Sequence, residues 1–114
     1  MTDEPLDYEA TLRTLLGLLG NKVRIELSGA VPGFRAGAGF SGVLERGVED
    51  VVQRVVGSDE AINFRVIEGG HEGWFIVGQS TFQTAVIVRS GAWPALVIRA
   101  GQMDVTVTPE PGAL

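Results

Sequence analysis

Apolar and polar residues follow one another along most of this chain in the short patterns typical of β-strands. The pattern is clearest over residues 84–107, TAVIVRSGAWPALVIRAGQMDVTV. Residues 85–88 and 95–98 are apolar runs that end at Arg-Ser-Gly and Arg-Ala-Gly, and residues 104–108 then alternate between polar and apolar. Because the runs are short, β-branched and bounded by glycine, they predict three consecutive strands of a small, strongly curved sheet.

Four more strands are expected before this meander, at residues 22–27, 40–49, 61–67 and 73–78. Gly42 and Gly47 are expected to be bend points of the second strand. The third, AINFRVI, alternates so that Ile62, Phe64 and Val66 face inward. The valines of residues 48–56 fit a helical stripe and also fit a strand that pairs with residues 61–67; the hairpin is favoured because valine is a poor helix former.

Glycine-rich segments between these strands are predicted to be loops. Residues 28–39, SGAVPGFRAGAG, lack the Gly-Lys-Ser/Thr ending of a phosphate-binding loop, so a flexible hairpin loop is expected. Residues 68–73, EGGHEG, are expected to form a second loop, and residues 79–83 a polar bend.

One amphipathic helix is predicted at residues 7–20. Asp7 is its expected N-cap, and Gly20 with Asn21 provides a left-handed stop. One face carries the large apolar side chains, namely Tyr8, Leu12, Leu15, Leu16 and Leu19. This face is interpreted as a cap on the end of a barrel, with docking of another subunit as the alternative.

Composition sets the outer limits. The 114 residues, 45% of them apolar, suit a single domain with one core. The helix, a barrel at residues 22–108 and a loose tail at residues 109–114 make up this domain. The chain has no cysteine, which excludes disulfides and thiolate metal sites. No segment has the length of a membrane span and the first residues are acidic, so the cytoplasm is the expected location. The net charge of −5 weakens a nucleic-acid function, and DNA binding is not expected.

Residues 12–44 show the order of a short helix, the strand LLGNKVRIEL, a glycine loop and FSGVLE, and a second segment reads LVIRAGQMDVTV. These two parts of the chain resemble Sm-like proteins, and LVIRAGQMDVTV is similar to the second Sm motif of that family. Val48 and Ala100 depart from the aspartate and glycine of the family pattern. The resemblance implies a strongly bent antiparallel SH3-like or Sm-like barrel that joins its copies by edge-strand pairing, commonly into rings. It also implies single-stranded RNA binding through Asn63 and Arg99.

Few residues offer catalytic chemistry. The single histidine, His71, has Glu68 and Glu72 nearby, a set that could hold zinc, but a solvated loop tip is the preferred interpretation. No catalytic residue, metal site or cofactor is therefore expected, and the chain is not expected to be an enzyme.

Two tryptophans and two arginines are the other candidates. Trp74 is expected in the core, and Trp93, which precedes a proline in a turn, is the candidate interaction anchor. Arg89 and Arg99 end their strands at matching positions, either as solvated strand ends or as part of an anion or RNA site.

Two functions follow. The first is a non-catalytic binding or adaptor module that forms homo-oligomers through strand edges, since few of the predicted strands are guarded by lysine or proline. The alternative is an Sm-like protein that binds single-stranded RNA.

Overall fold

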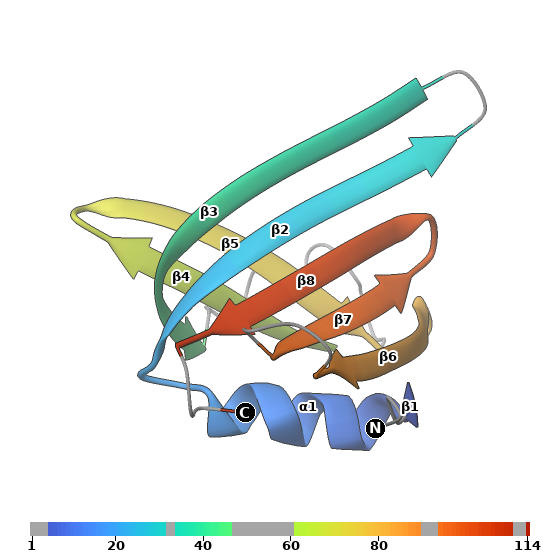
Figure 1. The fold of residues 1–114 in the computed structure, drawn as a ribbon, viewed down its shortest axis with the longest axis horizontal. Helices are drawn as coiled ribbons and strands as arrows, with labels where there is room; N and C mark the ends of the chain where they lie inside the picture. The colour runs from blue at the N-terminus through green and yellow to red at the C-terminus, as the bar shows by residue number, and fades with distance from the viewer. Residues whose placement is uncertain (1–4, 32–33, 47–60, 90–93, 111–113) are drawn as a thin grey trace.

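The computed structural model describes residues 5–31, 34–46, 61–89, 94–110 and 114, and it contains one helix and one eight-stranded antiparallel sheet (Figure 1). The elements in chain order are β1 (Pro5–Leu6), α1 (Tyr8–Gly17), β2 (Lys22–Val31), β3 (Phe34–Arg46), β4 (Ala61–Glu68), β5 (His71–Gly78), β6 (Phe82–Val88), β7 (Ala95–Ala100) and β8 (Met103–Pro109). The predicted mainly β fold with one short helix is confirmed. The sheet order is β1-β6-β7-β8-β2-β3-β4-β5, so among the described residues the sheet ends at β1 and β5 and the expected closed barrel is not seen.

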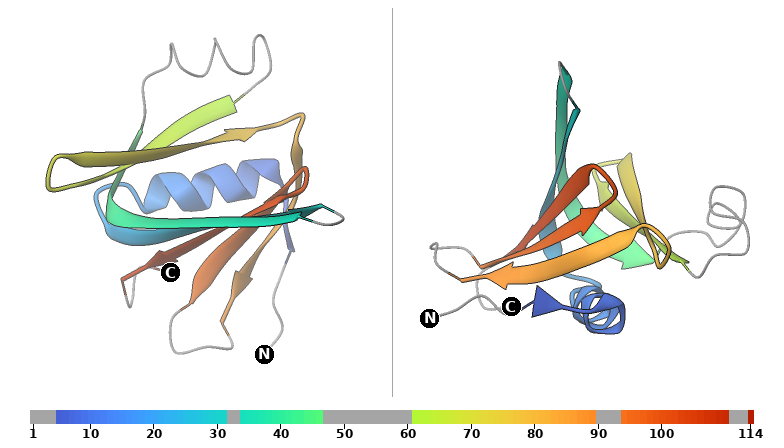
Figure 2. Two further views of the ribbon diagram at one scale, coloured as in Figure 1. Left: turned by 90° about the horizontal axis from the view of Figure 1, so that it is seen from above. Right: turned by 90° about the vertical axis from the view of Figure 1, so that its right-hand side faces the viewer.

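The sheet folds over on itself because β3 is shared between its two halves. Residues 34–43 of β3 pair with β2, whereas residues 43–46 pair with β4. In the left view of Figure 2, the β4–β5 hairpin lies on one side of α1 and the β2–β3 pair lies on the other. Gly42 lies at this transition with a φ of 155°, and a Cβ built on it would lie 2.5 Å from the carbonyl oxygen of Ile67. Only glycine fits this close approach of two backbones. Gly47, the other expected bend point, lies outside the described residues.

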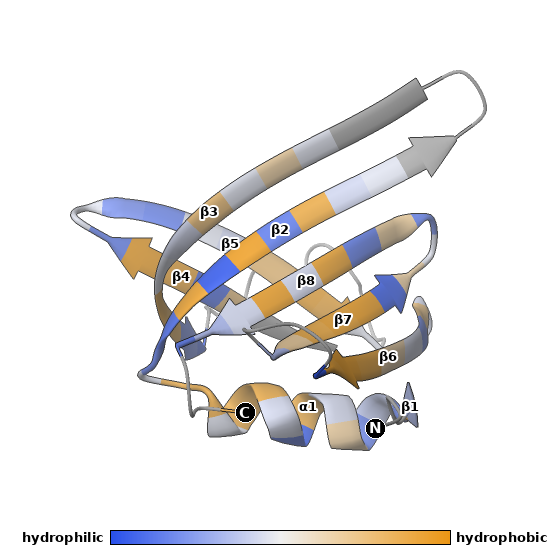
Figure 3. Ribbon diagram, in the orientation of Figure 1, coloured by the Kyte–Doolittle hydropathy of each residue, from blue (hydrophilic) through white to orange (hydrophobic). Residues whose placement is uncertain are grey.

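The core lies between the two halves of the sheet and α1. Figure 3 shows the alternation of hydrophobic and hydrophilic residues along β2 and β8. The most completely buried large apolar side chains come from four strands, the helix and its C-cap, namely Leu15, Leu18, Ile25, Leu44, Phe64, Leu96 and Ile98. The rings of Phe64 and Phe75 stack with centroids 5.4 Å apart across β4 and β5. Burial of such side chains stabilises the fold by about 1.5–3 kcal/mol each.

Helix α1 covers this core as the capping interpretation predicted. The Asp7 carboxylate accepts a hydrogen bond from the Ala10 N–H at 2.7 Å, and Gly20 has the left-handed φ of 85°. Tyr8, Leu12 and Leu15 are buried as expected, but Leu16 is 39% exposed. Leu18, the C-cap residue, is buried instead, because it lies three positions after Leu15 and continues the buried face of Thr11 and Leu15, whereas Leu16 points away from that face.

The predicted meander is confirmed as β6, β7 and β8. Ala85 lies opposite Ile98, and Leu96 lies opposite Val107, so the buried residues of the three strands share one face. Pro109 is the last residue of β8 and is buried, and Leu114 packs against the core cluster.

The predictions that residues 28–39 and 68–73 form glycine-rich loops were wrong. Residues 28–31 and 34–37 continue β2 and β3 as a paired arm, with Ser28 opposite Gly37. The arm projects beyond the rest of the sheet (Figure 1). Glycine and alanine can take extended backbone when a neighbouring strand satisfies their hydrogen bonds, so composition alone misled the prediction.

The second predicted loop is a tight hairpin. Glu68 lies opposite His71, and the turn consists of Gly69 and Gly70 at φ values of 57° and 84°. Two consecutive positive φ angles define a type I′ turn, which joins strands with only two residues.

The predicted hairpin between residues 48–56 and 61–67 is not tested, because residues 48–56 lie outside the described residues. The described neighbours of β4 are β3 and β5. Within the described part of the chain, no helix has the length and apolar character needed to cross a membrane.

The bend at Gly42 yields a stability prediction. We expect Gly42→Ala to lower the free energy of unfolding by about 2–4 kcal/mol, because the added methyl group collides with the Ile67 carbonyl and the φ of 155° strains any other residue. Gly17→Ala is the matched control: a Cβ there meets nothing within 4 Å, so this variant should gain up to about 1 kcal/mol. Urea unfolding followed by circular dichroism measures both. Equal stabilities of the two variants would contradict the role assigned to Gly42.

Candidate binding face on strands β3, β4 and β5

The outer face of β3, β4 and β5 carries an exposed mixture of apolar and charged side chains, here named the Trp74 face. Its members are Val43, Glu45, Arg65, Ile67, Glu72, Trp74 and Ile76. They are brought together by strand alternation, because Leu44, Phe64, Val66, Phe75 and Val77 take the inner positions of the same strands.

An apolar stripe crosses the Trp74 face diagonally toward β5. Val43 lies opposite Ile67, and Trp74 is the diagonal neighbour of Ile67 on the next strand. Val43 is 39% exposed and Trp74 is 50% exposed. The expectation that Trp74 belongs to the core was therefore wrong: Phe75 is buried, so its neighbour Trp74 points to the other side of the sheet.

Arg65 lies at the centre of this face. Its guanidinium is 3.3 Å from the carboxylate of Glu45 on β3 and 4.0 Å from that of Glu72 on β5. The Arg65 side chain is 35% exposed, and its Nε atom is buried with no hydrogen-bond partner among the described residues. Trp74 lies directly opposite Arg65. Tryptophan and arginine are the residues most enriched among those that dominate protein interfaces.

Strand β5 is also an edge of the sheet. It pairs with β4 over its whole length, and no described strand pairs with its other side. At the opposite end of the sheet, β1 covers part of the edge of β6 through Pro5 and Leu6. Strand β5 has neither a lysine nor a proline, the residues that commonly protect an open edge.

The three residues of the predicted RNA site lie on different parts of the sheet. Asn63 is on β4 in register with Ile76, whereas Arg99 is on β7, four positions away in the strand order. The Arg99 guanidinium forms an ion pair with Asp104, with Nε–Oδ1 and Nη2–Oδ2 distances of 3.1 Å. Arg89 is exposed just after β6. RNA binding by these residues stays a prediction.

The matching sequence positions of Arg89 and Arg99 do not make them neighbours. Strands β6 and β7 are antiparallel, with Thr84 opposite Arg99 and Val88 opposite Ala95. The two arginines therefore lie at opposite ends of the strand pair, about 17 Å apart along the strands at 3.4 Å per residue. Trp93, the predicted interaction anchor, lies outside the described residues.

The residues near His71 form the end of the β4–β5 hairpin. Glu68 accepts a hydrogen bond from the Ser41 hydroxyl at 3.2 Å, and Glu72 faces Arg65. His71 itself is exposed. The described residues contain no group of three or more histidine, cysteine or carboxylate side chains placed to hold a metal ion.

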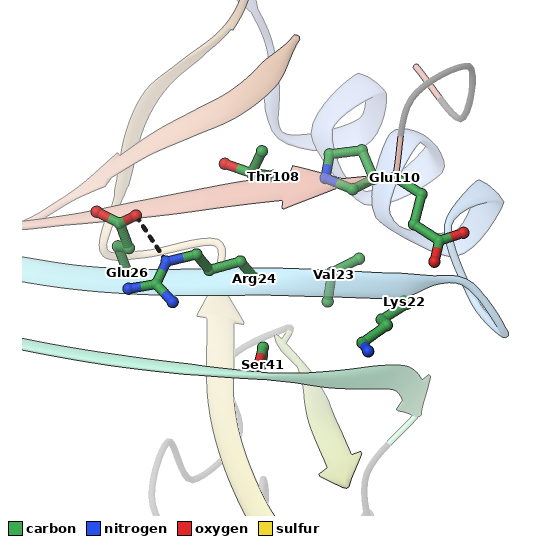
Figure 4. Close-up of a pocket in the computed structure, with 8 residues that line it drawn as sticks. Lys22, Val23, Arg24, Glu26, Ser41, Thr108 and Glu110 are labelled. Atoms are coloured by element: carbon green, nitrogen blue, oxygen red, sulfur yellow. Dashed lines mark hydrogen bonds and ion pairs between the residues drawn. The ribbon is translucent and has the colours of Figure 1, made fainter. Parts of the chain in front are cut away.

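A shallow pocket of about 450 Å³ lies on the outer side of β2, between β3 and β8 (Figure 4). It is lined by Lys22, Val23, Arg24, Glu26, Ser41, Thr108, Pro109 and Glu110. The Arg24 Nε atom lies 3.1 Å from the Glu26 carboxylate in an exposed ion pair. The positive charges of Lys22 and Arg24 in this pocket are balanced by the negative charges of Glu26 and Glu110. The pocket therefore favours neither an anion nor a cation.

Comparisons of the chain with family models, curated proteins and solved structures found no match. The Sm-like resemblance therefore stays a prediction. Sequence reasoning missed the Trp74 face because GWFIVG is a continuous apolar run that hides its alternation. The signal that could have found it is the Gly69-Gly70 turn, because a two-residue turn sets Trp74 opposite Arg65.

The variant Arg65→Met tests whether the ion pairs of the Trp74 face stabilise the fold. We expect Arg65→Met to change the free energy of unfolding by less than about 1 kcal/mol, because methionine keeps the aliphatic stem while removing a half-exposed ion pair and a buried N–H without a described partner. Chemical unfolding measures the difference. A loss of more than about 2 kcal/mol would show that the ion pairs of Arg65 hold the three strands together.

Proposed function

We propose that this chain is a non-catalytic binding module of the cytoplasm that associates with a second copy of itself through the open edge of β5. The observation that carries the proposal is the position of β5. It is an eight-residue strand at the end of the sheet, with no lysine or proline, and it borders the apolar stripe of the Trp74 face. An unpaired strand edge presents N–H and C=O groups that another strand can pair with.

The side chains along this edge support protein association. Trp74 offers a large surface and an indole N–H, and it is half exposed beside Arg65. Exposed large apolar side chains next to an open edge are an aggregation hazard unless a partner covers them. Pairing of two copies covers both at once.

The opposite end of the sheet is less suited to association. Strand β1 lies along β6, with Pro5 opposite Val86 and Leu6 opposite Ala85. Proline cannot donate a backbone hydrogen bond, so β1 is a poor template for a further strand. Of these two ends of the sheet, β5 is therefore the one proposed to bind.

Light scattering coupled to size-exclusion chromatography tests the proposal. The wild-type chain at tens of micromolar should elute at a mass above the monomer's 12.1 kDa. Trp74→Lys should shift it to the monomer, because a lysine on an edge strand must lose hydration when the edge is paired. Leu16→Lys on α1, which replaces an apolar residue that is 39% exposed, is the control and should leave the mass unchanged. A monomeric wild type would refute the proposed function.

A further inference from the structure

We infer that the second copy pairs with β5 in the antiparallel sense, with the two-fold axis passing through Trp74. This inference rests on the proposed function and adds the register of the two strands. The reasoning starts from the turn that precedes β5, because that turn determines which backbone groups of β5 point away from β4.

The type I′ turn at Gly69 and Gly70 is closed by the pair of Glu68 and His71. The closing pair of a two-residue hairpin exchanges hydrogen bonds, and hydrogen-bonded pairs then recur at every second residue. His71, Gly73, Phe75 and Val77 therefore direct their N–H and C=O groups toward β4. Glu72, Trp74 and Ile76 direct theirs to the open edge.

The far end of this edge is already occupied. The Gly78 carbonyl accepts a hydrogen bond from the Thr81 hydroxyl at 3.3 Å, and both Val77 and Gly78 are buried. The Tyr8 hydroxyl of α1 donates to the Val77 carbonyl, also at 3.3 Å, which places α1 against this end of β5 although that carbonyl points toward β4. The accessible part of the edge therefore ends at Ile76.

A two-fold axis through Trp74 uses all of the accessible groups. It sets Trp74 opposite Trp74 of the second copy and Glu72 opposite Ile76 of the second copy, so that Glu72, Trp74 and Ile76 all exchange backbone hydrogen bonds. An axis through Gly73 leaves Ile76 without a strand partner, and an axis through Phe75 sets Glu72 against the occupied Gly78.

The outer side chains agree with this register. No like charges lie directly opposite, since each Glu72 faces an isoleucine. The half-exposed Trp74 rings meet at the axis, flanked on either side by Arg65 of their own copies. On β3, residues 34–42 pair with β2 alone, and the middle of this open edge offers only Gly37, Ala38 and Gly39 to pack against a tryptophan. Pairing of β5 with itself is therefore favoured over pairing of β5 with β3.

Cysteine cross-linking tests the register, because the chain contains no cysteine of its own. Single variants Glu72→Cys, Trp74→Cys and Ile76→Cys are oxidised and run on non-reducing gels. We expect Trp74→Cys alone to shift to a covalent dimer. Glu72→Cys and Ile76→Cys should each stay monomeric alone but form a covalent dimer when mixed, which keeps Trp74 in both copies. Leu16→Cys is the control and should not cross-link.

The outcomes separate the two claims. A monomeric wild type in light scattering refutes the proposed function together with the register. A dimeric wild type whose Glu72→Cys and Ile76→Cys variants fail to cross-link when mixed, or in which either cross-links alone, overturns the register only. A mass above the dimer would show that β5 pairs with a different edge, which also overturns it.

Discussion

The burial of one face of a strongly bent sheet is the interaction on which this structure depends. Two halves of the sheet share β3, and their inner residues reach the same core only because β3 changes partner from β2 to β4 near Gly42. The stacked Phe64 and Phe75 lie on one side of that bend, and Ile25 and Leu96 lie on the other. A chain of this size has one core, so every strand must send alternate side chains into it.

The same alternation determines what remains outside. On β4 and β5, the burial of Phe64, Phe75 and Val77 leaves Arg65 and Trp74 on the outer face. On β7 and β8, it leaves Arg99 opposite Asp104, and the two side chains form an exposed ion pair. The outer faces thus differ in character: the meander presents an ion pair whose charges satisfy each other, whereas the β4–β5 hairpin presents an aromatic ring beside an arginine.

Local alternation in the sequence was enough to predict much of the fold. The strand at residues 61–67, the meander and the Asp7 N-cap follow from spacing and residue type, and the structure confirms them. The paired arm of residues 28–31 and 34–37 could not be predicted, because a glycine-rich segment becomes a strand only when another strand lies beside it. Trp74 was misplaced because a continuous apolar run does not reveal which residues face inward. The positions of Arg89 and Arg99 depend on strand direction, which their spacing in the sequence does not contain.

The order of strands determines which end of the sheet is open, and this order is a long-range property. At one end, β1 brings Pro5 and Leu6 back from the start of the chain to lie on β6. At the other end, β5 follows β4 through a turn of only two residues, so the chain has no spare segment there that could cover the edge from the turn side. The segment that follows β5 turns at once into β6, and α1 reaches only the end of β5 through Tyr8 and Val77. Within the described part of the chain, no strand covers the rest of this edge, so its remaining backbone groups face water or another chain. When identical copies meet through one such edge, antiparallel pairing about a two-fold axis closes the assembly, because each copy then has no further edge of the same kind to offer.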